Sequence, residues 1–306
     1  MDLAQQPKAE LHLHLEGAVE AGTLLELDPS LTAEEIAERY QYDDFPGFIE
    51  SFKWVLGHLR TPEHYALITR RLLARLIEQN VRYAEITLAA GVILWRRLDF
   101  APIYEAVRRE SESSPVQVCW ILDAIRQLGA AHAMCVAELA AERVDQGVVG
   151  FGIGGNEALG PVEWFLEVFE FARRRGLHLT IHAGETVGPE SVWGALRGGA
   201  ERIGHGIRAA DDPALLARLR EQNVPLEICI SSNVATGAVP SLRDHPLRRL
   251  YDAGVPIVLN TDDPAMFHTS LTREYELAAR EFGFTHQELH ELVANSFRYA
   301  FRRTEP

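Results

Sequence analysis

The chain has 306 residues, of which 47% are hydrophobic and 24% are charged, enough for a large core in one or two domains. Its formal net charge of −14 argues against a nucleic-acid polymer or an anionic membrane as the main partner, but is compatible with a small substrate. The three cysteines lack close spacing, no signal peptide is visible, and no apolar run approaches the roughly 18 residues that span a bilayer. These features predict a cytoplasmic protein.

Short apolar runs, often rich in β-branched residues, alternate along the chain with longer segments of helical periodicity. The predicted strands cover residues 10–15, 81–88, 116–122, 148–153, 177–181, 202–205, 226–230 and 257–260. Typical helix starts lie between them: Thr61 can cap a helix that begins at Pro62, and Thr285 with Glu288 forms a capping-box pattern. This alternation predicts an α/β protein, a closed (β/α)8 TIM barrel that forms a single domain over residues 1–306.

Residues 20–59 depart from this alternation, because they make an unusually long connection between the first and second predicted strands. The segment contains "DDFPGFIESFKWVLGHL" and is predicted to form two or more helices that carry aromatic side chains. We expect this helical insertion to cover one end of the barrel as a lid.

Polar side chains collect where four of the predicted strands end. They are His12, His14 and Glu16 at the first strand, His182 and Glu185 at the fifth, His205 at the sixth, and Asp262 and Asp263 at the eighth. Because alternate residues of a strand share a face, His12 and His14 point the same way. Such a pair alone could equally lie on a solvent-exposed face of a strand. These groups, however, all lie at carboxyl ends of parallel strands, where barrel enzymes build their sites. Three histidines and a carboxylate that converge there are suited to a divalent metal.

Six motifs occur in chain order, namely "AELHLHLEGA", "GFGIGGNE", "IHAGE", "RIGHG", "CISSN" and "LNTDDPAMF". Together they resemble the adenosine deaminase family of the amidohydrolase superfamily, and the resemblance covers nearly the whole chain. It implies a hydrolase that binds one catalytic Zn²⁺ per chain, although other divalent ions are not excluded. The ligands that the resemblance implies are His12, His14, His182 and Asp262.

The resemblance also implies roles for residues around the metal. Glu185 would donate a proton to purine N1, and His205 would hold or deprotonate the metal-bound water. Asp263 would hydrogen-bond N7, the backbone of Gly155 would meet N3, and His14 would also border the substrate. The chemistry agrees with these roles, because zinc lowers the pKa of bound water from 15.7 towards about 7 and protonation of N1 makes the neighbouring carbon electrophilic. We therefore expect burial to raise the pKa of Glu185.

Asp262 and Asp263 are adjacent, so they cannot both point inward from a regular strand. Because Pro264 favours an extended conformation of Asp263, we expect the chain to turn over the barrel mouth at this point. The first carboxylate would then face the metal, and the second would face the base.

The chain has only two lysines, Lys8 and Lys53. Binuclear relatives in the superfamily, such as dihydroorotase-like and phosphotriesterase-like enzymes, use a carboxylated lysine on the fourth strand to bridge two metals. The fourth predicted strand here reads "VVGFGIGG" and has no lysine near it in the sequence, which favours a single metal ion. The unrelated cytidine-deaminase pattern, His-x-Glu followed by Pro-Cys-x-x-Cys, is missing.

The pocket residues leave the group at purine N9 open. Glu16 stands where adenosine deaminases usually carry an aspartate that reaches the ribose 5′ side, and a glutamate there resembles adenine deaminases. Gly155, by contrast, matches the nucleoside enzymes. The segment "FPGFIESFKWV" resembles the hydrophobic lid of the family, so Phe45, Phe48 and Phe52 are predicted to wall the pocket, although ordinary helix packing explains these aromatics equally well.

The predicted activity is zinc-dependent hydrolytic deamination of a 6-aminopurine nucleoside to its 6-oxo product and ammonia. The nucleoside would be adenosine or a 5′-modified adenosine such as aminodeoxyfutalosine. One alternative is deamination of free adenine. A third hypothesis, a non-catalytic purine-binding protein, would require the loss of a metal ligand or the proton donor, and the sequence retains all of these residues. The oligomeric state stays open.

Overall fold

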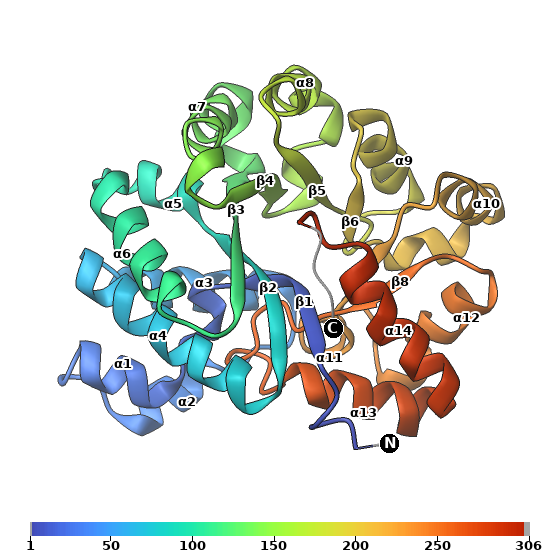
Figure 1. The fold of residues 1–306 in the computed structure, drawn as a ribbon, viewed down its shortest axis with the longest axis horizontal. Helices are drawn as coiled ribbons and strands as arrows, with labels where there is room; N and C mark the ends of the chain where they lie inside the picture. The colour runs from blue at the N-terminus through green and yellow to red at the C-terminus, as the bar shows by residue number, and fades with distance from the viewer. Residues whose placement is uncertain (1, 303–306) are drawn as a thin grey trace.

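In the computed structural model, which describes residues 2–302, eight parallel strands form one sheet in sequence order (Figure 1). The strands are β1 (Lys8–His14), β2 (Val81–Leu88), β3 (Gln117–Ile125), β4 (Val148–Gly154), β5 (His178–Ala183), β6 (Arg202–His205), β7 (Leu226–Ile228) and β8 (Ile257–Leu259). A parallel bridge between Leu13 and Asp262 brings β1 beside the segment that follows β8. The sheet therefore nearly closes, and the predicted (β/α)8 barrel is confirmed.

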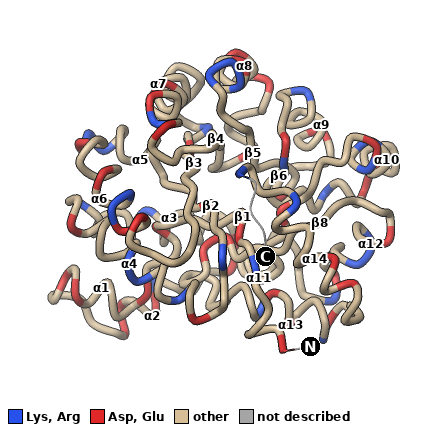
Figure 2. The backbone as a smooth tube through the Cα atoms, viewed as in Figure 1, with Lys and Arg blue, Asp and Glu red and all other residues tan. Residues whose placement is uncertain are grey.

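Helices surround the sheet (Figure 1). They are α4 (Pro62–Glu78), α5 (Ala90–Trp95), α6 (Phe100–Glu112), α7 (Gly129–Ala141), α8 (Leu166–Arg174), α9 (Pro189–Gly198), α10 (Pro213–Gln222), α11 (Ile230–Ala235), α12 (Leu247–Asp252), α13 (Leu271–Phe282) and α14 (His286–Arg298). The two helix starts expected at Thr61 and Thr285 are confirmed, the second with a complete capping box. Figure 2 shows Lys and Arg interspersed with Asp and Glu along these helices. No helix within residues 2–302 is long and apolar enough to cross a membrane.

Three further helices precede α4, where the sequence predicts an insertion. They are α1 (Ala21–Leu27), α2 (Ala33–Arg39) and α3 (Phe45–His58). Two tyrosine hydroxyls fasten this segment to the barrel: Tyr40 donates to the backbone oxygen of Val19, and Tyr42 donates to that of Met266, each at 2.6 Å. Because Met266 follows β8, the second bond holds the start of α3 beside the carboxyl ends of the strands.

A network of buried charges fills the interior of the barrel below the strand ends. Arg202, the first residue of β6, donates to Glu85 Oε2 and to Glu227 Oε1, both at 2.5 Å, and all three side chains are buried. The guanidinium also donates to the backbone oxygen of Tyr299 at 2.9 Å, and it lies 3.5 Å from the ring centre of Phe301. We call Arg202, Glu85 and Glu227 the floor network. The segment after α14 covers it from below.

Candidate metal centre and active site

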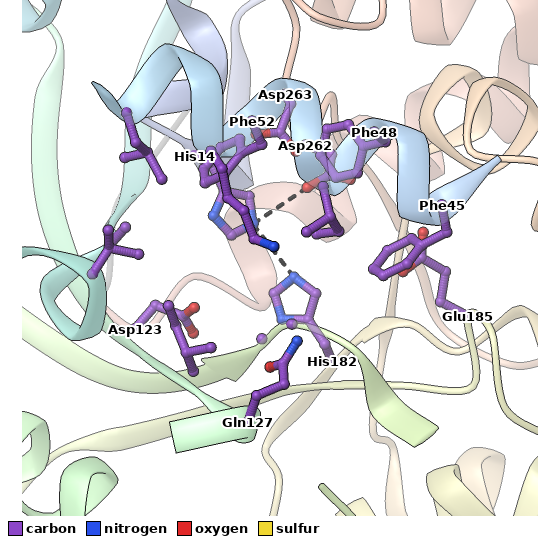
Figure 3. A pocket seen from close by; sticks show the side chains of 18 of the residues that line it. His14, Phe45, Phe48, Phe52, Asp123, Gln127, His182, Glu185, Asp262 and Asp263 are labelled. Carbon is purple, nitrogen blue, oxygen red and sulfur yellow. Dashed lines mark hydrogen bonds and ion pairs between the residues drawn. The ribbon is translucent and has the colours of Figure 1, made fainter. Parts of the chain in front are cut away.

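Four side chains from three distant parts of the chain meet at the carboxyl ends of the strands, and Figure 3 shows three of them, His14, His182 and Asp262. His12 and His14 come from β1, His182 comes from β5, and Asp262 follows β8. Asp262 Oδ1 lies 3.3 Å from Nε2 of both His12 and His14, and His14 Nε2 lies 3.3 Å from His182 Nε2. Their four ligand atoms all lie within 4.8 Å of one another, so a single ion can touch each of them. We call these four residues the mouth cluster.

The mouth cluster fits a divalent cation. His12 Nε2 is buried and makes no hydrogen bond with any residue that the structure describes, which leaves a nitrogen atom unsatisfied at the centre of the group. Burial lowers the pKa of His12, but the neighbouring carboxylates of Asp262 and Glu227 outweigh it and raise this pKa to about 10. The cluster therefore attracts positive charge strongly, and three imidazoles with one carboxylate form a donor set that suits zinc.

A buried carboxylate orients the first of these histidines from behind. Glu227 Oε2 accepts a hydrogen bond from His12 Nδ1 at 2.8 Å and one from Thr180 Oγ1 at 2.9 Å. With its proton held on Nδ1, His12 presents the lone pair of Nε2 to the mouth cluster. Burial raises the pKa of Glu227, but Arg202 and His12 outweigh it and lower this pKa to about 2. Sequence reasoning missed Glu227, although a charged residue inside the apolar run "LEIC" was a visible indication.

Two residues at the site adopt the left-handed backbone region that favours glycine: Asp262 has φ 64° and His205 has φ 61°. Such conformations cost of order 1–3 kcal/mol each and cluster at functional sites. The chain therefore changes direction at Asp262, next to the residue that Pro264 was expected to hold extended. Hydrogen bonds from Asp262 N to His12 O (3.0 Å) and from His14 N to Asp262 O (2.8 Å) hold it there.

Glu185 lies in the loop after β5, and another carboxylate anchors that loop. Glu157 accepts the backbone N–H groups of Gly184, Glu185 and Thr186 at 2.7–3.0 Å. Burial raises the pKa of Glu185 well above its usual range, and the charges of Asp262 and Glu157 add to this effect. A raised pKa is what we expected for a residue that must carry a proton near neutral pH. Sequence reasoning did not identify Glu157 as an anchor, although it ends the quoted motif "GFGIGGNE".

A chain of hydrogen bonds determines which nitrogen of His205 carries its proton. The backbone N–H of Leu247 donates to His245 Nδ1 at 3.1 Å, so the ring proton of a neutral His245 must sit on Nε2. That nitrogen lies 3.2 Å from Asn233 Oδ1, and Asn233 Nδ2 lies 3.1 Å from His205 Nδ1. Asn233 must therefore direct its oxygen toward His245 and its NH2 group toward His205. His205 Nδ1 then accepts a hydrogen bond from Asn233 Nδ2. We call His245 and Asn233 the relay.

His205 is consequently a hydrogen-bond donor toward the site. Burial lowers the pKa of His205 to about 4 and that of His245 to about 3, which keeps both rings neutral near pH 7. The proton of His205 then sits on Nε2, which lies 3.8 Å from Glu185 Oε2 and 3.9 Å from Asp262 Oδ2. Of the two roles expected for His205, this tautomer favours holding a water molecule over deprotonating it.

Asp263 also faces the site and is buried. Burial raises its pKa well above the usual range, and the neighbouring charge of Asp262 adds to this effect. Its Oδ1 has no hydrogen-bond partner among residues 2–302. A Cβ on Gly17 would stand 1.7 Å from this oxygen, so the glycine of "HLEGA" is what makes room for the carboxyl group.

A cavity of roughly 830 Å³, part of it open to solvent, lies over the mouth cluster. Its lining includes most of the predicted site residues: His14, Phe45, Phe48, Phe52, Gly155, His182, Glu185, His205, Asp262 and Asp263. The three phenylalanines come from α3, and their successive ring centres lie 6.0 Å apart. Lys53 of α3 also lines the cavity, and it pairs with Glu50 at 2.7 Å.

Glu16 does not line this cavity. The short 3-10 helix η1 (Glu16–Ala18) follows β1 directly and turns the side chain away, so that it is completely buried. Its Oε1 accepts the backbone N–H of Ala89 at 3.2 Å, and Ala89 itself forms part of the cavity wall. The structure therefore places Glu16 behind the wall, and not on the ribose side of the cavity as expected from the sequence.

Comparison with known proteins agrees with this geometry. The family model described as adenosine deaminase matches residues 7–305. The chain belongs to the adenosine deaminase family. It is 38% identical to an aminodeoxyfutalosine deaminase of Streptomyces coelicolor over 98% of this chain and 81% of that protein. It is also 38% identical to an adenine deaminase of Rhizobium leguminosarum bv. trifolii over 96% of this chain and 94% of that protein.

Solved structures show the same relationship. An adenine deaminase from Arthrobacter aurescens superposes with a TM-score of 0.90 at 29% identity, covering 97% of this chain and 94% of that one. An amidohydrolase from Burkholderia ambifaria with bound Zn superposes with a TM-score of 0.89 at 25% identity, covering 98% and 87%. Family membership and the mouth cluster together make this adenosine deaminase family member a metal-dependent aminohydrolase.

Proposed function

We propose that the protein removes the 6-amino group of a purine nucleoside by hydrolysis, giving the 6-oxopurine nucleoside and ammonia. The observation that carries this proposal is the mouth cluster, which shares one cavity with Glu185, His205 and Asp263. The ion would be one Zn²⁺ held by His12, His14, His182 and Asp262. The chemistry that it supplies is to make a water molecule acidic enough to act as hydroxide near neutral pH.

The protein groups supply the protons that this reaction needs. Glu185, whose pKa is raised, donates a proton to N1 while a water oxygen adds to C6. The Nε2–H of His205 orients that oxygen. Asp263, protonated through its raised pKa, donates a hydrogen bond to N7. The C6–N bond then breaks as the added oxygen becomes the 6-oxo group. One proton of the water leaves with the amino group as ammonia, the other restores Glu185, and the proton given to N1 stays there, so that atoms and charge balance.

One wall of the cavity supports a nucleoside over the free base. This wall consists of the apolar side chains Phe45, Phe48 and Phe52 of α3, and a 5′-modified ribose would extend along it. We propose that residues 20–59 act as a lid on this side, with Phe48 and Phe52 against the ligand.

Free adenine is the second candidate, because adenine deaminases and aminodeoxyfutalosine deaminases are equally similar to this chain. The two candidates can be separated by comparing the turnover of adenine, adenosine and aminodeoxyfutalosine. Turnover is measured as the loss of ultraviolet absorbance of the adenine ring. We expect higher kcat/KM for at least one nucleoside than for adenine. Turnover of adenine alone would favour the second candidate. Failure to release ammonia from all three by the metal-loaded protein would contradict both and favour a purine-binding protein.

A further inference from the structure

One carboxylate that faces the cavity has no part in the reaction proposed above. Asp123 lies near the carboxyl end of β3, lines the cavity and is only 6% exposed. Its Oδ1 is buried, and no residue that the structure describes donates a hydrogen bond to it. Native structures rarely leave a buried carboxylate unpaired, because this costs about 1–3 kcal/mol or more. Sequence reasoning passed over this residue.

Neighbouring cations do not fill this gap. Arg126 is the nearest buried guanidinium along the chain, but its Nη1 donates to Gly160 O at 2.8 Å and its Nη2 donates to His182 O. Lys53, in the cavity lining, pairs with Glu50. The unpaired Oδ1 of Asp123 therefore indicates that its hydrogen-bond donor belongs to a bound molecule and not to the chain.

The neighbouring strand leaves space for this carboxylate. Gly152 and Gly154 of β4 lie beside Asp123, and Gly152 is its partner in the sheet register. A Cβ on Gly152 would stand 2.8 Å from Asp123 Oδ1, and a Cβ on Gly154 would stand 3.0 Å from Oδ2. Glycine in a strand weakens the strand and often marks a place where a ligand approaches. The alternating glycines of "GFGIGG" thus make room for the carboxylate of Asp123 in the wall of the cavity.

The position of Asp123 relates it to one end of a bound purine. Figure 3 shows Asp123 and Glu185 on opposite sides of His182. In a purine, N9 lies across the bicyclic ring from N1. A substrate that directs N1 toward Glu185 therefore directs N9, and whatever is attached to it, toward the side of Asp123.

We propose that Asp123 accepts a hydrogen bond from a ribose 2′- or 3′-hydroxyl and thereby selects ribonucleosides. This inference rests on the proposed function, since it uses the orientation of the purine given there. A carboxylate with an unpaired oxygen in the cavity wall is a natural acceptor for a ribose hydroxyl, as in the acidic residue that binds the ribose of dinucleotides. Free adenine offers only N9–H at this place.

The experiment compares adenosine, 2′-deoxyadenosine, 3′-deoxyadenosine and adenine as substrates of the wild-type protein and of D123N. Asp145→Asn, the same change at an exposed residue, is the matched control. We expect wild type to prefer adenosine over at least one deoxynucleoside by 10-fold or more. In D123N, kcat/KM for adenosine should fall about 10- to 100-fold, as for loss of a charged hydrogen bond, and the preference should shrink to within about threefold. D145N should match wild type.

Several results would overturn the proposal. Equal wild-type turnover of all three nucleosides would do so without any variant. A D123N protein that loses activity on every substrate equally and also loses bound metal would show a positioning role toward His182. Selective loss of adenine turnover would show that N9–H is the donor. Where turnover is too slow to compare, the Kd values of inosine and 2′-deoxyinosine by calorimetry give the same test. Failure of the wild type on every aminopurine would contradict the proposed function itself.

Discussion

Two groups of buried charge in this barrel differ in how completely they are paired. In the floor network, Arg202 donates to both Glu85 and Glu227 and to a backbone oxygen. In the mouth cluster, His12 Nε2 has no hydrogen-bond partner among residues 2–302, and the Nε2 atoms of His14 and His182 lie only 3.3 Å apart. The floor network is complete within the protein, whereas the mouth cluster needs a cation. Burial of charge alone therefore does not mark the functional site, whereas a group of metal-ligating side chains that meet without complete pairing does so here.

The two groups share one contact, the hydrogen bond between His12 Nδ1 and Glu227 Oε2. Through it, the floor network helps to orient a metal ligand. Variants of the mouth cluster, the floor network and the contact between them should therefore differ in whether they lower activity, metal binding or stability.

The largest effect on activity is expected from a metal ligand. His182→Ala should lower kcat more than about 10³-fold and reduce the bound metal, because the activation of water depends on the ion. The fold should persist, since the mouth cluster is not a closed network. Activity assays, elemental analysis and circular dichroism measure these effects, and His132→Ala on α7, away from the site, is the control. Full activity of H182A would rule out this residue as a ligand.

A somewhat smaller loss is expected from the proton donor. Glu185→Gln should lower kcat about 10²- to 10⁴-fold, as for loss of a general acid, with bound metal unchanged. Glu185 acts in its protonated form, and its pKa is raised, so wild-type kcat/KM should fall as the pH rises through that pKa. Measured pH–rate profiles test whether kcat/KM falls in this way as the pH rises. A profile that only rises with pH across the neutral range would argue against Glu185 as the acid.

The floor network offers a matched pair of variants. Glu227→Gln and Glu85→Gln each remove one charge beside Arg202 and should each lower the free energy of unfolding by about 3–5 kcal/mol. Only Glu227 contacts His12, so only E227Q should also weaken metal binding, about 10- to 100-fold. Urea unfolding and metal titration separate the two effects. Equal metal affinity in the two variants would show that the contact between floor and mouth has no functional role.

The smallest effect is expected from the relay. His245→Ala frees the amide of Asn233 to rotate, so His205 loses its fixed tautomer. We expect kcat to fall about 10-fold with KM nearly unchanged, and a shifted pH profile. His245→Gln, which can still donate to Asn233 Oδ1, should restore part of the rate. An unchanged kcat and pH profile in H245A would contradict the relay.

The barrel and most of the site could be predicted from the sequence, because each metal ligand lies at the end of a short strand that is soon followed by glycine or proline. "HLHLEG", "IHAGE" and "NTDDP" place their polar residues at the carboxyl ends, and topology brings these ends together. The insertion was also visible as an excess of chain length between two strands.

The rest depends on contacts between distant strands that no local pattern reveals. Glu227 acquires its role from His12 and Arg202, and Asp123 from the glycines of β4. Glu16 was misplaced because one turn of 3-10 helix after β1 directs it behind Ala89. The turn at Asp262 is left-handed, and Pro264 gave no indication of this.

The most direct test of the account is the metal content of the purified protein together with its activity before and after chelation. We predict about one equivalent of divalent ion per chain, loss of ammonia release from the aminopurine substrate when a chelator removes the ion, and recovery when Zn²⁺ is added back. In H182A, both binding and recovery should fail. Unchanged deamination by protein from which the ion has been removed would contradict the central claim that the mouth cluster acts through a bound cation.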